Sequence, residues 1–291
     1  MRAREDWHVP VRSRLLRSGP YCRATHEAHR LQAFIGRQRR DLPPPATVNA
    51  VRILGYHRIA DDDELAVPRK AFRAQMERLL ALGALPISLD EARRILEEGI
   101  DRFYVCVTFD DGYYDNMTEA VQVLHELGIP ATIFVPTGAI DGAERLYWYR
   151  EQPRLLSWSE LRELSADSLL SIGSHTRRHP DLTRLTDEAA WEEIAGSKAE
   201  LEYRLGMPVT SFAYPGGRMS EREARMVVEA GYRVAVTTRL GPNQAGVRPE
   251  ALRRNFIDRR DDESLLEARL AGLLDAPWGF QRLRSAIHSA T

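Results

Sequence analysis

Short apolar runs alternate with segments of helical periodicity from residue 51 to the end of the chain. The run FYVCVTF at 103–109 is apolar throughout, as is typical of a strand that is buried on both faces. The pattern predicts strands at 51–57, 85–89, 103–109, 130–136, 169–175, 210–215, 232–238 and 252–257. It predicts helices at 68–83, 90–99, 116–128, 157–164, 186–206, 220–231 and 261–274, with Asp90, Ser157 and Ser220 as N-caps.

This alternation amounts to about seven strand-then-helix units, with no sequence repeat behind them. Such a density of units indicates a parallel sheet, and about seven or eight of them in about 240 residues suit a closed or nearly closed (β/α) barrel. The alternative is an open doubly wound sheet. No glycine-rich phosphate loop follows the first strand, which counts against a dinucleotide-binding fold. We therefore expect an α/β fold with a barrel of about seven strands.

Polar residues follow several of the predicted strands, at the ends where the chemistry of such a barrel is found. They are His57, Asp110, Asp111, His175, Tyr214 and Pro215. Because the carboxyl ends of parallel strands meet at one face, we expect these residues to converge on one mouth.

His175 and His179 are four residues apart, so one helical turn would place both imidazoles on one side, close enough to share a metal ion. The alternative is a pair of unrelated surface histidines. A carboxylate from a neighbouring strand end would complete three ligands and leave a position for water, which is the pattern of a catalytic metal site.

The adjacent acids Asp110 and Asp111 allow two roles, although an aspartate at a helix start can also be a simple N-cap. Neighbouring residues that leave a strand point in different directions, so one acid could bind the metal while the other faces the water on it. The metal lowers the pKa of that water from about 15.7 towards about 7, and the second acid takes the proton. His57 is a candidate general acid for the leaving group by its position and its ordinary pKa.

Three motifs, "TFDDGYYDN" at 108–116, "SHTRRHP" at 174–180 and "FAYPGG" at 212–217, resemble those of the polysaccharide deacetylases of the NodB-homology type, carbohydrate esterase family 4. The resemblance covers roughly residues 51–260. It implies a distorted (β/α) barrel and a divalent metal, most often zinc, with cobalt, nickel and manganese as alternatives. It also implies removal of N-acetyl groups from an amino-sugar polymer.

The same resemblance implies roles by position. Asp110 corresponds to the catalytic base, and the metal ligands correspond to Asp111, His175 and His179. Tyr214 lies where the family's third motif lends a backbone N–H to the oxyanion.

The chain departs from the common family pattern in two places. The Arg that usually opens the third motif is absent, and so is the late Leu-x-His motif that normally supplies the acid. This resembles the subgroup that includes the poly-N-acetylglucosamine deacetylases, in which the barrel order is circularly shifted and an early "YH" supplies the acid. "LGYHRI" at 54–59 fits that subgroup and again selects His57, while Arg254 is the candidate to replace the missing Arg.

Four residues are candidate substrate contacts: Tyr113, Trp158, Pro215 and Arg254. Tyr113 and Trp158 have an equally simple alternative, which is packing at the rim or against a helix. The segment 137–157 is long, aromatic and hard to assign to an element, which is typical of a substrate-contacting insertion.

Composition adds limits. Hydrophobic residues make up 43% and charged residues 29%, which is typical of a globular protein, and a formal net charge of −1 argues against nucleic acid as a partner. Residues 1–45 contain ten Arg and four acidic residues, and "LPPPA" at 42–46 ends this basic stretch. We predict a basic extension at 1–46 and a barrel domain at 47–291. The extension is either flexible or a peripheral contact with an acidic surface, membrane or partner.

The first residues contain no continuous apolar stretch of the kind found in a secretory signal, and no run approaches about 18 apolar residues. We therefore expect a cytoplasmic protein, or one peripheral to a membrane. The expected activity is metal-dependent N-deacetylation of an amino sugar or polysaccharide. The alternatives are a related amidase on a small or lipid-linked amide and a non-catalytic carbohydrate-binding protein.

Overall fold

The computed structural model describes residues 49–62, 65–149 and 151–275. The predicted basic extension at 1–46, with its alternative roles, and the last residues of the predicted barrel domain lie outside this part of the chain. Among the described helices, none combines the length and the apolar character that crossing a bilayer requires.

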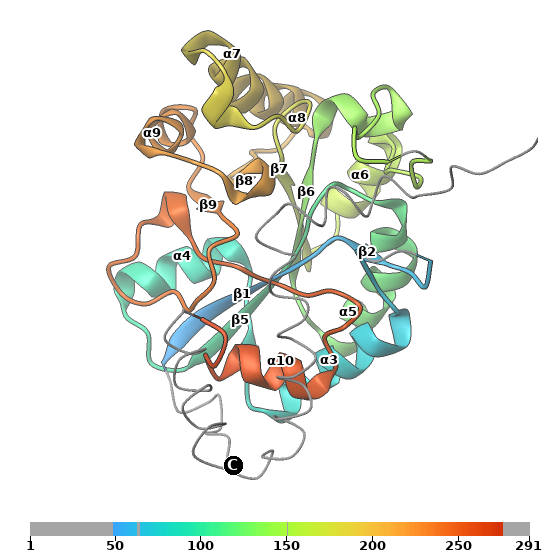
Figure 1. Cartoon of the computed structure of the whole chain (residues 1–291), viewed down its shortest axis with the longest axis vertical. Coiled ribbons are helices and arrows are strands. Elements are labelled where there is room, and N and C mark those ends of the chain that lie inside the picture. Colours follow the sequence, from blue (N-terminus) through green and yellow to red (C-terminus); the bar gives the residue numbers. More distant parts are fainter. Residues whose placement is uncertain (1–48, 63–64, 150, 276–291) are drawn as a thin grey trace, which may run out of the picture. The chain divides into compact units, whose positions relative to one another are not determined.

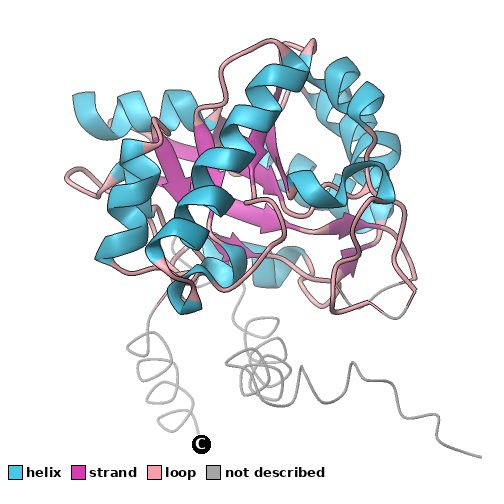
Figure 2. Ribbon diagram, turned by 90° about the horizontal axis from the view of Figure 1, so that it is seen from above, coloured by secondary structure: helices cyan, strands magenta, loops and turns pink. Residues whose placement is uncertain are grey.

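One parallel sheet forms the centre of the molecule, with helices around it (Figures 1 and 2). Its order is β10-β1-β5-β6-β7-β8-β9, and β4 pairs with the first part of β5. The strands are β1 Ala50–Tyr56, β4 Leu85–Pro86, β5 Phe103–Phe109, β6 Ala131–Val135, β7 Leu170–Ser174, β8 Ser211–Ala213, β9 Val234–Val236 and β10 Asn255–Phe256. A second, two-stranded sheet pairs β2 Arg58–Ile59 with β3 Ala66–Val67.

The segment 252–256 connects the two edges of the large sheet. Leu252 forms a parallel bridge with Val236 of β9, and Asn255 pairs with Leu54 of β1. The sheet therefore curls into the expected distorted (β/α) barrel rather than the open doubly wound alternative.

The helices follow the predicted positions closely: α3 Arg69–Ala81, α4 Leu89–Glu98, α5 Val121–Leu127, α6 Trp158–Ser165, α7 Asp187–Trp191, α8 Ser197–Leu205, α9 Glu221–Glu229 and α10 Glu263–Leu270. Two predicted long helices contain a widened π-helical turn, at Asn116–Ala120 before α5 and at Glu192–Gly196 between α7 and α8.

The predicted caps are confirmed at two helices and wrong at one. Ser157 and Ser220 each form a capping box with a glutamate three residues later. Helix α4, however, begins one residue earlier than predicted, because the Ser88 hydroxyl accepts from the N–H of Glu91. Asp90 is therefore a first-turn residue and not the cap.

The described residues form two large apolar clusters and a small one around Tyr113 and Tyr149. The larger cluster lies between strands and helices and includes Phe72, Leu161 and Phe212. A second cluster unites residues of β1, β5, β6, β8 and β9 with Leu89, Ala92 and Leu96 of α4. A hydrogen bond from Thr210, just before β8, to Asp90 places the start of α4 at the amino-terminal ends of the strands. Helix α4 thus covers the end of the barrel opposite to the candidate site.

Candidate metal and acid site

The two adjacent carboxylates lie where β5 ends in a sharp left-handed turn. The N–H of Asp110 still donates to the Tyr56 carbonyl oxygen at 2.9 Å, but Asp111 has a φ of 72°. Gly112 continues the turn with a φ of 65°, and a Cβ there would lie 2.7 Å from the Val135 Cγ1 atom. Only glycine fits this position without strain.

This turn changes the expected directions of the two acids. The Nε2 atom of His175 lies 3.9 Å from Asp110 Oδ2 and 3.7 Å from Asp111 Oδ1. The strand alternation that would have separated the carboxylates is broken by the left-handed residue, so both approach the same imidazole.

His175 and His179 also meet, but not through a helical turn. Thr176 and His179 both have left-handed φ values, 67° and 59°, and the N–H of His179 donates to the Thr176 hydroxyl at 3.0 Å. The two imidazole centroids lie 4.6 Å apart. The prediction that the rings come together agrees with the structure, whereas the helical geometry offered for it is wrong.

Asp111, His175 and His179 each offer one ligand atom, and these atoms all lie within 4.8 Å of one another. The buried Oδ1 of Asp111 has no hydrogen-bond partner, and it lies 3.7 Å from Nε2 of each histidine. The Nδ1 atom of His175 lies 2.7 Å from the Ala213 carbonyl oxygen. A proton donated there leaves the lone pair of Nε2 facing the carboxylate, as in many metal-binding histidines.

The protonation states suit a cation. Burial lowers the pKa of His175, and burial followed by the charge of His175 holds the pKa of His179 well below its usual range, so both rings are neutral. Burial and then the charge of Asp110 raise the pKa of Asp111 to about 8. Neutral imidazoles and a buried carboxyl group without a counter-charge fit a divalent metal ion, whose charge would favour the ionised form of Asp111.

Asp110 is held by a different partner. Arg254 donates from Nη1 to Asp110 Oδ1 at 2.6 Å and from Nη2 to Oδ2 at 2.8 Å. Burial alone would raise the pKa of Asp110, but the charge of Arg254 outweighs burial and the pKa falls to about 2. Asp110 is therefore ionised and oriented.

Arg254 itself has no exposed surface, and its Nε atom donates to the Thr237 carbonyl oxygen at 3.1 Å. Two roles were predicted for Arg254. The first, contact with a substrate, does not agree with this complete burial. The other prediction, that it takes the place of the missing Arg beside the acid pair, agrees with this geometry.

His57 directly follows β1, and its ring stacks on Phe256 with centroids 4.9 Å apart. It is close enough to the acids that its charge lowers the pKa of Asp110. Asn116 donates from Nδ2 to the His57 carbonyl oxygen at 2.8 Å, and Asp115 accepts from the N–H of Ile59 at 3.0 Å. The sequence reasoning missed these two anchors, although they end the motif that contains the acid pair.

Tyr214 and Pro215 do not have their expected surroundings. The N–H of Tyr214 donates to the Val236 carbonyl oxygen at 3.2 Å within the β8–β9 pairing, and the buried side chain donates to the Glu250 carbonyl oxygen at 2.9 Å. That N–H is therefore engaged in the sheet rather than free for an oxyanion. Pro215 is buried at the start of a short 3-10 turn, and its contact with substrate stays a prediction.

Tyr113 and Trp158 follow the packing alternative. Tyr113 is fully buried, and its hydroxyl donates to Asp111 Oδ2 at 3.1 Å. Trp158 belongs to the larger core cluster, with the guanidinium of Arg204 lying 5.2 Å from its ring centroid. Neither side chain presents a face to a sugar.

The segment 137–157 runs beside the metal-ligand group. The ring of Trp148 lies edge to face with that of His179 at 4.5 Å, and the Tyr149 hydroxyl lies 3.1 Å from that of Tyr113. Tyr147 leaves three quarters of its surface exposed. Contact of this segment with substrate stays a prediction.

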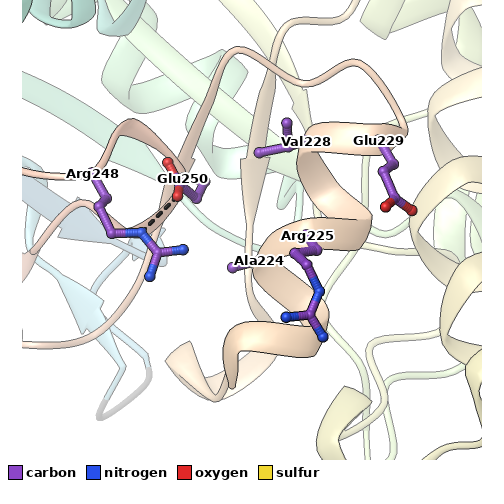
Figure 3. Close-up of a pocket in the computed structure, with 6 residues that line it drawn as sticks. All are labelled: Ala224, Arg225, Val228, Glu229, Arg248 and Glu250. Carbon is purple, nitrogen blue, oxygen red and sulfur yellow. Dashed lines mark hydrogen bonds and ion pairs between the residues drawn. The ribbon is translucent and has the colours of Figure 1, made fainter.

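A hollow of about 280 Å³ lies elsewhere, between α9 and the segment 248–250 (Figure 3). Its lining consists of Ala224, Arg225, Val228, Glu229, Arg248 and Glu250. Arg248 donates to Glu250 at 2.7 Å, so its charge is partnered. None of the predicted site residues lines this hollow.

Comparisons with known proteins agree with this geometry. The family model described as polysaccharide deacetylase matches residues 97–235. YxkH of Bacillus subtilis, provisionally named as a polysaccharide deacetylase, is 33% identical over 191 residues, which is 65% of this chain and 64% of that protein. The chitooligosaccharide deacetylase of Rhizobium leguminosarum bv. trifolii is 34% identical over 99 residues, which is 34% of this chain and 39% of that protein.

The chain thus spans less than two thirds of the length of either curated relative. Among solved structures, IcaB from Ammonifex degensii superposes with a TM-score of 0.69 at 24% identity, covering 77% of this chain and 98% of that one. This likeness supports the fold, and the sequence matches support the ancestry. Residues 97–235 of this chain therefore resemble the polysaccharide deacetylase family in sequence, and the likeness to YxkH extends over 191 residues.

Proposed function

We propose that this chain is a metal-dependent hydrolase that removes N-acetyl groups from the amino sugars of a saccharide. The observation that carries the proposal is the buried, unpaired oxygen of Asp111, which faces two neutral imidazoles beside a second, ionised carboxylate. A buried carboxylate oxygen without a partner is costly in a purely structural role. The match of residues 97–235 to the polysaccharide deacetylase family model supports the same reaction.

Asp111, His175 and His179 are the residues that would hold the metal ion. When bound, the ion supplies Lewis acidity, which lowers the pKa of a water molecule and polarises an amide carbonyl. Two imidazoles and one carboxylate suit zinc, and the same donor atoms also accept cobalt, nickel or manganese.

Asp110 is the proposed general base. A carboxylate has about four lone-pair sites, so the two hydrogen bonds from Arg254 leave sites that can accept from a water molecule. The pKa of about 2 means that the group is ionised at any ordinary working pH. The Asp110 carboxylate is a weak base at this pKa. Its orientation is already fixed by Arg254, however, so the carboxylate does not have to reorient to accept the proton.

His57 is the proposed general acid. Stacking on Phe256 and the hydrogen bond from Asn116 to its carbonyl oxygen hold it at the mouth next to Asp110. Protonation of the departing amide nitrogen by the imidazolium completes the exchange, in which water and the N-acetyl group become acetate and a free amine.

The substrate class follows from the relatives. One of them is named a chitooligosaccharide deacetylase, so we propose an N-acetylated oligosaccharide or polysaccharide as substrate. Because Trp158, Tyr113 and Pro215 are buried, we propose the segment 137–157 as the main source of sugar recognition.

Acetate release by metal-stripped and zinc-reloaded protein tests this proposal. The panel runs from single N-acetylglucosamine through long β-linked oligomers to a lipid-linked N-acetylated sugar. We expect zinc-dependent release from oligomers. Acetate release only from the small or lipid-linked compounds would show that the substrate is a small or lipid-linked amide and not a polymer. Sugar binding without any acetate release would contradict the enzymatic proposal.

A further inference from the structure

One oxygen of the Asp111 carboxylate is fixed by a tyrosine while the other faces the histidines. The hydroxyl of Tyr113 donates to Oδ2 at 3.1 Å. Oδ1 has no hydrogen-bond partner and lies 3.7 Å from the Nε2 atoms of His175 and His179. The single hydroxyl proton of Tyr113 therefore sets which oxygen is left for a metal ion.

A second tyrosine supports the first. The hydroxyls of Tyr113 and Tyr149 lie 3.1 Å apart, and their rings meet edge to face with centroids 6.1 Å apart. Tyr113 has one hydroxyl proton, so when the Asp111 carboxylate accepts that proton, a hydrogen bond between the two hydroxyls requires the proton of Tyr149. The resulting chain of hydrogen bonds runs from Tyr149 through Tyr113 to Asp111.

The C-terminal part of the segment 137–157, which contains Tyr149, is also hydrogen-bonded to the motif that contains Asp110 and Asp111. The N–H of Tyr114 donates to the Arg154 carbonyl oxygen, and the N–H of Leu156 donates to that of Gly112, both at 2.9 Å. In addition, the ring of Trp148 packs edge to face on His179 at 4.5 Å. Residues 148–149 therefore contact the metal-ligand group at two of its three members, directly at His179 and through Tyr113 at Asp111.

We propose that Tyr113, supported by Tyr149, is a positioning residue that holds the Asp111 carboxylate in its metal-binding orientation and couples residues 148–149 to metal binding. The inference rests on the proposed metal site. Because the hydrogen bond holds one carboxylate oxygen, the rotation of the carboxylate is already restricted before the metal ion binds. Metal binding therefore costs less conformational entropy. By reciprocity, metal binding also stabilises this segment against the site.

Zinc affinity, measured by competition with a chelator, tests the inference without using activity. Tyr113→Phe removes the hydrogen bond to Asp111, and we expect a loss of about 10- to 100-fold in zinc affinity. Tyr149→Phe removes only the supporting bond, and we expect a loss of about 2- to 10-fold. The double variant should bind no more weakly than Tyr113→Phe alone, because Tyr149 acts through Tyr113.

Tyr147→Phe is the matched control, since it removes a hydroxyl from the exposed neighbour in the same segment and should leave the affinity unchanged. Thermal unfolding of the metal-free variants shows that each is folded. Should Tyr113→Phe not fold, a loss confined to Tyr149→Phe and absent from Tyr147→Phe still supports the inference.

Zinc affinities of Tyr113→Phe and Tyr149→Phe equal to that of the unmodified chain would overturn the inference and leave the proposed function standing. Asp111→Asn separates the two proposals further, because asparagine accepts the left-handed backbone but is a poor ligand. An unmodified chain that binds zinc no better than Asp111→Asn would refute the metal site itself, and the inference with it.

Discussion

The two ends of the barrel are built on opposite principles. At the carboxyl-terminal ends of the strands, three side chains in left-handed backbone conformations (Asp111, Thr176 and His179) surround buried charges. At the amino-terminal ends, α4 packs Leu89, Ala92 and Leu96 into an apolar cluster. All four non-glycine residues with positive φ in the described chain lie in segments that follow the carboxyl ends of β5, β6 and β7.

This difference shows which end of the barrel contains features that lower the stability of the fold. Left-handed residues and unpaired buried oxygens each oppose folding, whereas the α4 end contributes ordinary apolar burial. Apolar burial at the α4 end therefore stabilises the fold and offsets the destabilising features at the other end. Substitutions at the two ends should separate activity from stability, and the three following ones are ordered by the size of the expected effect.

Asp110→Asn should lower acetate release by about 10²- to 10⁴-fold while zinc affinity stays near that of the unmodified chain. The amide keeps the size of the side chain but cannot accept the proton, and Asp110 is not one of the three grouped metal-ligand residues. Steady-state rates and zinc content, measured on the same preparation, check both parts. A fully active variant would show that Asp110 is not the base.

Arg254→Met should lower the free energy of unfolding by about 3–5 kcal/mol, because it leaves the buried Asp110 carboxylate without its counter-charge. Urea unfolding of the metal-free protein measures this change. Arg248→Met, which removes an exposed guanidinium, is the matched control and should change stability little.

Adding Asp110→Asn to Arg254→Met should restore part of the lost stability, because no buried charge then remains uncompensated. A double variant as unstable as the sum of the single ones would show that Arg254 acts by packing on Phe256 rather than by its charge.

Leu96→Ala, at the other end, should lower the free energy of unfolding by about 2–4 kcal/mol and leave the acetate release of each folded molecule unchanged. The removed methyl groups leave a cavity on the buried face of α4. Leu80→Ala on α3, where the side chain is 36% exposed, should cost less. A fall in turnover without a fall in stability would contradict the separation of the two ends.

The strands were largely predictable because their signal is local. The run 103–109 matches β5 residue for residue. A short apolar run between polar residues is typical of a buried strand in a globular protein. The same reasoning placed Asp110 and Asp111 at the mouth. Helix α4 differed only in its cap, where the side chains of Ser88 and Asp90 both suit that position.

The directions of side chains beyond the strand ends were not predictable in the same way. Periodicity assumes helical or extended backbone, and the left-handed residues at Asp111, Thr176 and His179 obey neither. For this reason the helical turn predicted between the histidines was wrong, and neither alternative for Tyr113, a sugar groove or packing at the rim, included its hydrogen bond to Asp111.

Contacts across the barrel were the least predictable. Tyr149 lies 36 positions from Tyr113, and no spacing rule connects them. The family match at 97–235 includes neither His57 nor Arg254. In the sequence, His57 was predicted from its position and from the resemblance of "LGYHRI", and Arg254 from its position. Arg254 was found only because it belongs to a predicted strand on the late side of the barrel.

The segment 252–256 joins the two edges of the sheet and also holds Arg254, which lies 144 positions after Asp110. This places a limit on when the site can exist during synthesis. A growing chain has the acid pair and both histidines long before it has the arginine that orients Asp110. The last strand to be made closes the barrel and completes the acid site in one step, so a prematurely ended chain has neither.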